Sequence, residues 1–203
     1  MLDHAQHGFR TTELDPDLLA TPFRRQTKWQ VITGAPCCGK TTLINLLAGK
    51  GFATVPEVGR EYIEREMAQG RTIEEIRESP AAFCRRIRDM QLETELRLPV
   101  EQPTFLDRAF PDCLTFFRVA GLDPNQVLPE CFHHQYASVF VLDRFPFLLD
   151  GVRTEGDAAS SFADGWLPRD YGALGYSVVR VPVLSPGERL AFVLERLSEQ
   201  GLI

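Results

Sequence analysis

The sequence predicts a three-layer α/β fold in which a parallel β-sheet is flanked by helices. Short apolar runs alternate with segments of helical periodicity from Trp29 onward, which is the pattern of βαβ units. The first apolar run also leads into a glycine-rich turn that opens directly into a helical pattern. With 203 residues, the chain fits one domain of medium size with a buried core.

Five apolar runs are expected to be strands, and capping residues mark several helix starts between them. The expected strands are residues 29–33, 52–56, 104–106, 137–142 and 177–183. The expected helices are residues 41–48, 60–69, 80–98, 111–120, 160–174 and a last one that begins near 186. Ser79 and Pro80 form an N-cap followed by a first-turn proline, and Ser185 with Glu188 forms a capping box.

The first part of the chain differs from the rest in its pattern. Residues 1–27 lack sustained periodicity and contain Pro16 and Pro22, so we expect an extended or partly ordered N-terminal arm there. The alternating pattern then continues to the end of the sequence. We therefore expect an arm of residues 1–27 and one domain of residues 28–203.

Charge, hydropathy and cysteine usage exclude several classes of function. The net charge of -6 argues against a general nucleic-acid surface, so no nucleic-acid partner is expected. No apolar run approaches the ~20 residues that cross a bilayer, and the first residues lack a secretory signal, which together predict a cytoplasmic protein without a membrane partner. The 5 cysteines lack the spacing of zinc ligands and are expected to be reduced.

The glycine-rich turn has the spacing GxxxxGKT from Gly34 to Thr41, between an apolar strand and an amphipathic helix. Glycines allow backbone N–H groups to surround phosphates, and the helix N-terminus adds partial positive charge. Lys40 is expected to reach the β- and γ-phosphates, and the Thr41 hydroxyl to ligate Mg²⁺. The residues expected to bind ATP are Gly34, Ala35, Pro36, Cys37, Cys38, Gly39, Lys40, Thr41 and Thr42. The motif indicates a P-loop NTPase.

Two cysteines stand at variable positions of this loop. Cys37 and Cys38 are either small residues that fit the turn or redox-sensitive thiols, because a thiol beside a helix N-terminus tends to be acidified. Under the second interpretation, alkylation or oxidation of these thiols blocks nucleotide binding.

Phosphoryl transfer requires a carboxylate that holds Mg²⁺ at the end of a neighbouring strand. Asp107 and Asp143 both follow apolar strands, and each precedes an arginine. The strand order expected in P-loop kinases favours Asp107 as the metal ligand, while Asp143 remains an alternative or an anchor for a lid. A strand-ending aspartate that caps the next turn is the other interpretation of both residues. Arg108 is expected to bind substrate.

Glu57 follows the second strand at the edge of the expected cleft, where it can act as a general base on an acceptor hydroxyl. Arg60, one helical turn later, can hold an anionic group of the substrate. A glutamate in the first turn of a helix, stabilised by the helix dipole, is the alternative for Glu57.

Residues 150–155 form a polar segment after the fourth strand, which predicts a lid that brings Arg153 onto the transferring phosphate. A solvated loop arginine is the alternative. His133 and His134 lack metal-ligand spacing and are expected to be surface or structural residues.

Four segments together resemble the NadR-like P-loop family, small AAA-labelled ATPase domains related to ribosylnicotinamide kinase. Besides the P-loop, the resemblance rests on Glu57, Gly59, Arg60, Glu61 and Tyr62; on Asp107, Arg108 and Asp112; and on Asp143, Asp150, Gly151, Arg153 and Glu155. It extends from about Trp29 to Leu197 and implies a five-stranded parallel sheet, ATP with Mg²⁺, and a kinase-like cleft with a lid. The chain departs from the family at Cys37 and Cys38, where small residues are common.

Two functions remain open on these grounds. The first is a Mg²⁺-dependent phosphotransferase for a small, nucleoside-like hydroxyl acceptor. It is favoured because Arg108 stands where water-activating ATPases commonly carry a glutamate. The second is an ATPase or nucleotide-dependent switch that acts through a protein partner.

Overall fold

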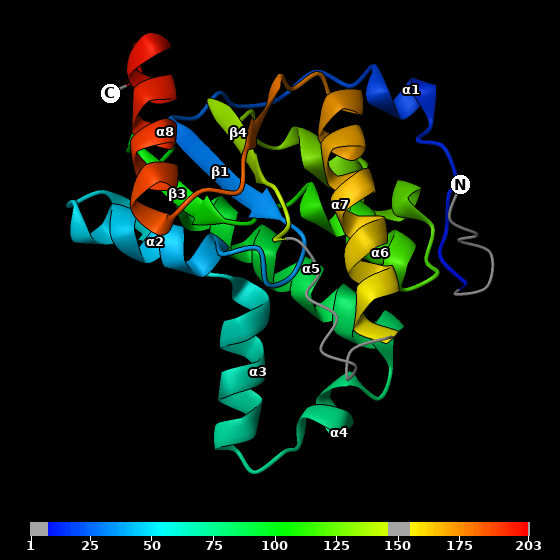
Figure 1. Ribbon diagram of the computed structural model, residues 1–203. Coiled ribbons are helices and arrows are strands. Elements are labelled where there is room, and N and C mark those ends of the chain that lie inside the picture. Colours follow the sequence, from blue (N-terminus) through cyan, green and yellow to red (C-terminus); the bar gives the residue numbers. More distant parts are fainter. Residues whose placement is uncertain (1–7, 146–154, 203) are drawn as a thin grey trace.

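The computed structural model describes residues 8–145 and 155–202 and contains one parallel five-stranded sheet (Figure 1). The strands are β1 (Trp29–Gly34), β2 (Ala53–Val55), β3 (Thr104–Asp107), β4 (Ser138–Leu142) and β5 (Val178–Val181). Their order is β2-β3-β1-β4-β5, and every neighbouring pair is parallel. The predicted fold class is confirmed, and β3 and β4 both lie beside β1.

Helices cover both faces of this sheet (Figure 1). They are α1 (Pro16–Leu19), α2 (Lys40–Gly49), α3 (Val58–Ala68), α4 (Ile73–Arg77), α5 (Pro80–Arg97), α6 (Asp112–Val119), α7 (Glu155–Ala173) and α8 (Pro186–Glu199), with short 3₁₀ turns at Pro124–Gln126 and Pro129–Phe132. Helices α2 and α8 pack on one face, and α7 packs on the other. This arrangement is the predicted three-layer sandwich.

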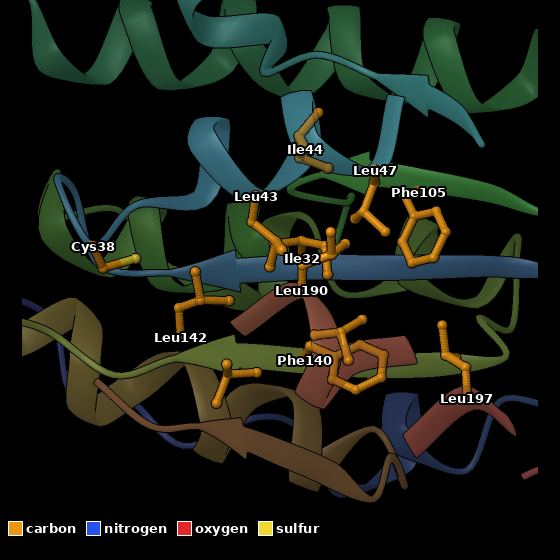
Figure 2. Packing of buried hydrophobic residues seen from close by; sticks show 12 residues of the cluster. Ile32, Cys38, Leu43, Ile44, Leu47, Phe105, Phe140, Leu142, Leu190 and Leu197 are labelled. Carbon is orange, nitrogen blue, oxygen red and sulfur yellow. The ribbon is translucent and has the colours of Figure 1, made fainter. Parts of the chain in front are cut away.

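Alternation of side chains along the central strands divides the core between the two faces. Ile32 and Phe140 belong to the cluster that contains the leucines of α2 and α8, whereas Val31 and Val139 belong to the cluster that contains Tyr171 of α7. Figure 2 shows the first cluster around the strands of the sheet. Both faces of the sheet are buried, which is why these strands form continuous apolar runs in the sequence.

The helices at one end of the sheet differ from the prediction. Helix α3 begins at Val58, two residues earlier than expected, and helix α4 was not predicted. A capping box between Thr72 and Glu75 starts α4, but the helix has 5 residues and buries only Ile76, so its apolar pattern is too short to predict a helix. Helix α7 begins at Glu155 rather than near residue 160.

The N-terminal arm is packed on the domain over its described residues. It contains the short helix α1, and Leu14 is buried against α6 and the 3₁₀ turns. The Arg10 N–H donates to the Arg118 carbonyl at 2.9 Å, and the Thr27 N–H donates to the Gln135 carbonyl at 2.9 Å. The described part of the arm is therefore held against the domain by backbone hydrogen bonds and by Leu14.

Candidate active site

The loop between β1 and α2 has a shape that glycine makes possible at two positions. Gly34 has φ of 145°, and a Cβ there would lie 2.8 Å from both the Cys38 sulfur and the Leu142 carbonyl oxygen. Gly39 has φ of 93° and stands at the N-cap of α2, without a side-chain cap. The backbone N–H groups at the start of α2 therefore remain available to an anion such as a phosphate.

Lys40 and the two cysteines occupy different positions around this loop. Lys40 is 5% exposed, its ammonium donates to the Ala35 carbonyl at 3.0 Å, and its pKa is lowered by burial and by the charge of Arg108. Cys37 is exposed, lines the adjacent cavity and has φ of 61°, whereas Cys38 is buried in the core. The two predicted thiols thus differ in accessibility, and Cys37 is the one that faces the site.

Asp107 meets the P-loop at the predicted metal position. The Thr41 hydroxyl donates to Asp107 Oδ2 at 3.1 Å, and Asp107 Oδ1 is buried without a hydrogen-bond partner among the described residues. Burial raises the pKa of Asp107, an effect that the nearby Lys40 ammonium opposes.

This pair of oxygens fits Mg²⁺, which prefers oxygen ligands and commonly takes one or two from the protein and the rest from phosphates and water. Within residues 8–145 and 155–202, no group of three or more His, Cys, Asp or Glu side chains gathers into a metal site. A magnesium ion at Thr41 and Asp107 would therefore depend on nucleotide phosphates for further ligands.

Asp143, the alternative metal ligand, has a different environment. Its carboxylate forms an ion pair of 2.7 Å with Arg180 of β5, and its side chain is 34% exposed. It follows β4, on the opposite side of β1 from β3. The structure brings Asp107 rather than Asp143 to Thr41.

Arg108 is the central cation of the site. Its Nε lies 3.4 Å from Glu57 Oε1, its Nη1 lies 3.0 Å from Asp112 Oδ1, and its guanidinium covers the Phe116 ring at 4.7 Å. Although burial acts to lower it, the pKa of Arg108 is raised above its ordinary value by Glu57 and Asp112. The φ of 72° at Arg108 is a conformation that residues other than glycine rarely adopt, and such strain is often found at functional sites.

Asp112 holds this arrangement in place. Its carboxylate accepts hydrogen bonds from the Thr33 hydroxyl, the Ala109 N–H and the Tyr171 hydroxyl, in addition to the contact with Arg108. All its partners are supplied by elements around the sheet, so the orientation of Arg108 is fixed by the fold. The sequence placed Asp112 in a family pattern but gave no indication of these partners.

Glu57 stands at the N-cap of α3 and faces the cavity without capping the helix. Its partner is Arg108, whereas Arg60, which the sequence associated with it, is exposed and also lines the cavity. The Glu57 carboxylate is 27% exposed and is held by one ion pair. Glu57 is therefore the more accessible of the two carboxylates that contact Arg108.

A cavity of about 1050 Å³ extends from the P-loop between α3, α5 and α6. Lys40, Thr41, Glu57 and Arg108 line its P-loop end. Its more distant wall is largely apolar and includes Ile63, Phe83, Ile87, Phe116, Phe117 and Ala120. The cavity can hold a small molecule beside the phosphate-binding loop.

Arg189 was not predicted to be a site residue. It is 2% exposed and donates hydrogen bonds to the carbonyls of Cys38, Pro182 and Asp143. Its guanidinium also covers the Phe145 ring at 4.8 Å. Arg189 thus connects the P-loop to the ends of β4 and β5. The predicted lid residue, Arg153, lies outside the described residues.

Comparisons with known proteins identify the family and the fold of the chain. The family described as "AAA domain" matches residues 29–189. No curated protein matches the chain. Among solved structures, a NadR protein in complex with NAD and AMP-PNP is similar with a TM-score of 0.60 and 20% identity, over 85% of this chain and 49% of that chain.

Two kinases of similar size share the fold. Thymidylate kinase from Candida albicans matches with a TM-score of 0.53 and 12% identity, over 87% of this chain and 93% of that one. Shikimate kinase from Aquifex aeolicus matches with a TM-score of 0.51 and 18% identity, over 86% and 98%. This chain spans about half the length of the NadR structures. At these identities the similarity shows the fold, which is that of P-loop kinases.

No described helix is long and apolar enough to cross a membrane.

Proposed function

Because the chain belongs to the AAA domain family and has the fold of P-loop kinases, we propose that it is a Mg²⁺-dependent phosphotransferase that moves the γ-phosphate of ATP to a hydroxyl group of a small, nucleoside-like acceptor. The observation that carries this proposal is the cavity of about 1050 Å³, which continues from Lys40 between α3, α5 and α6. A nucleotide switch needs the P-loop, but it does not need a cavity that continues from the P-loop between α3, α5 and α6.

In this proposal the P-loop from Gly34 to Thr42 holds the phosphates of ATP through backbone N–H groups and the Lys40 ammonium. Thr41 and Asp107 hold Mg²⁺, which when bound neutralises charge on the β- and γ-phosphates. The buried Asp107 Oδ1, which lacks a partner among the described residues, supports this assignment.

Glu57 is the proposed general base. It faces the cavity near the P-loop, and one ion pair with Arg108 at 3.4 Å orients it. Its role is to accept the proton of the acceptor hydroxyl as that oxygen attacks the γ-phosphorus. Arg108 keeps the carboxylate in place and lines the path of the phosphate, while the exposed Arg60 is available to the acceptor. Arg153 remains a proposed lid residue.

The first test measures ATP turnover alone and with a panel of nucleosides, sugars and cofactor precursors. Stimulation by an acceptor, with formation of its phosphorylated product, is expected. Lys40→Ala should abolish this turnover, whereas the control Lys50→Ala changes an exposed lysine at the other end of α2 and should leave it unchanged. Hydrolysis that no acceptor stimulates would favour the alternative, an ATPase or switch that acts through a protein partner.

The second test separates binding from transfer. Glu57→Gln should bind ATP as the wild type does but lose acceptor phosphorylation by about 100-fold or more, as expected for removal of a general base. Glu61→Gln changes an exposed glutamate on the same helix and is the matched control. Full transfer by Glu57→Gln would show that the base is another group.

A further inference from the structure

Gln91 is a buried amide in the wall of the cavity. It lies on α5, one turn after Ile87, and is 4% exposed. The cavity face of α5 consists of Pro80, Phe83, Cys84, Ile87 and Gln91, which recur at helical spacing. Gln91 therefore places a strongly polar group next to largely apolar neighbours.

The orientation of the Gln91 amide is fixed by Glu95, one turn further along α5. The Gln91 amide nitrogen donates to Glu95 Oε1 at 2.9 Å, and the Phe110 backbone N–H donates to the same oxygen at 2.7 Å. The Tyr136 hydroxyl donates to Glu95 Oε2 at 2.7 Å. Because the oxygens of an ionised carboxylate can only accept, Gln91 presents its NH₂ group to Oε1 when Glu95 is ionised.

The orientation of the Gln91 amide follows from the ionised form of Glu95. Burial raises the pKa of Glu95 to about 7, so the ionised form predominates above that pH. Both oxygens of an ionised carboxylate only accept hydrogen bonds. In this form the amide nitrogen of Gln91 is committed to Glu95, and the amide oxygen is left for the cavity.

We infer that the Gln91 amide oxygen is a preset hydrogen-bond acceptor. It selects substrates that carry an N–H donor on a planar ring. This inference rests on the proposed function and names the substrate class of the same cavity. The Phe116 ring, Ile87 and Phe83 line the cavity with Gln91 and suit an apolar ring. A nucleobase with an exocyclic amino group has both required features.

The Gln91 amide oxygen would discriminate between rings with and without an N–H donor, mainly because leaving this oxygen unpaired in a largely apolar wall costs free energy. A buried polar group that loses its partner costs about 1–3 kcal/mol, which corresponds to roughly 10- to 100-fold in affinity. A ring without the N–H donor would displace water from the amide oxygen without replacing the hydrogen bond. We therefore expect weaker binding of rings that lack the N–H donor, whatever the size of the ring.

The test uses two pairs of nucleosides that differ in the exocyclic amino group: adenosine with purine riboside, and cytidine with pyrimidin-2-one riboside. Binding is measured by calorimetry on the full chain saturated with a non-hydrolysable ATP analogue, so that the nucleosides do not occupy the ATP site. The wild type should bind the amino member of at least one pair about 10- to 100-fold more tightly. Equal affinity within both pairs, or no binding of any of the four, overturns the inference.

Two variants locate the effect. Gln91→Met keeps the size of the side chain and should reduce the preference to less than about threefold, through weaker binding of the amino member. Glu95→Gln is the matched control, because its side-chain carbonyl still accepts from Phe110 and Gln91 and should preserve the preference. A preference that persists in folded Gln91→Met contradicts the assignment. Transfer to some other acceptor, together with equal binding within both pairs, would leave the proposed function in place while removing this inference.

Discussion

The same dipeptide, Asp-Arg, follows the two strands that flank β1, but the two copies have different environments. Asp107 accepts a hydrogen bond from Thr41, and Arg108 lies between the carboxylates of Glu57 and Asp112. Asp107, Arg108 and Asp112 are buried, and Arg108 and Asp112 line the cavity together with the partly exposed Glu57.

The second copy lies toward the edge strand β5. Asp143 pairs with Arg180, and Arg144 donates to the Ser161 hydroxyl of α7 at 2.6 Å. Both Asp143 and Arg180 are more than 30% exposed in their side chains, at 34% and 42%. The elements around a strand end, rather than the Asp-Arg residues themselves, therefore determine whether the pair becomes part of the candidate active site.

The largest difference between the two copies is expected in stability. Arg108→Met leaves Glu57 and Asp112 without their shared cation and should lower the free energy of unfolding by about 3 kcal/mol, since removing one partner of a buried ion pair exposes the other charge to an apolar environment. Arg180→Met removes a partly exposed partner of Asp143 and should cost less than about 1 kcal/mol. Urea unfolding of both variants measures this, and equal losses would contradict the comparison.

A difference in activity should follow from the two aspartates. Asp107→Asn retains the shape of the side chain but removes the charge beside Thr41, so Mg²⁺-dependent turnover should fall by about 100-fold. Asp143→Asn is the matched control and should stay within about threefold of the wild type. Turnover is measured over a magnesium titration. A larger loss in Asp143→Asn would assign the metal to the other strand end.

The parts of the site that depend on neighbouring residues in the chain could be predicted from the sequence. The P-loop is a local structure, because its two glycines, Lys40 and Thr41 follow one another between a strand and a helix. The five strands were also recognisable, since each is a short apolar run. Asp107 was placed correctly beside the P-loop through the expected strand order, although its role as a metal ligand stays a prediction.

The contacts between distant residues could not be predicted. The sequence associated Glu57 with Arg60, one helical turn later, but its partner is Arg108, which directly follows β3. Arg189 and Gln91 were missed because their significance comes from the carbonyls and the carboxylate that they contact. Helix α4 was missed since it has 5 residues, of which only Ile76 is buried.

The carboxyl group of Glu95 is buried and has no arginine beside it among the described residues, unlike those of Glu57 and Asp112. Burial raises the pKa of Glu95 to about 7, from 4.5. Between these values the folded protein binds more protons at Glu95 than the unfolded chain does, so the free energy of unfolding falls as the pH rises from 4.5 to 7. Glu95→Gln should remove this part of the pH dependence, at most about 3 kcal/mol.

Urea unfolding at pH 5 and pH 7.5 measures the difference, and the exposed Glu93 on the same helix provides the control variant Glu93→Gln. The control should keep the wild-type pH dependence. The same slope in Glu95→Gln and in the wild type would mean that the carboxyl group titrates normally in the folded protein.

The smallest expected effect is on stability, and it comes from backbone strain at the cavity. Within the described part of the chain, the residues other than glycine with positive φ are Cys37 and Arg108, and both lie at the cavity. Cys37→Gly should relieve the strain at φ of 61°, whereas Cys37→Ala keeps it, so the glycine variant should be more stable by about 1 kcal/mol despite the greater freedom of glycine in the unfolded chain. Urea unfolding of the two variants measures the difference directly. An alanine variant as stable as the glycine variant would mean that the loop relaxes when the side chain is shortened. Backbone strain at Cys37 would then no longer distinguish the cavity from the surroundings of Asp143.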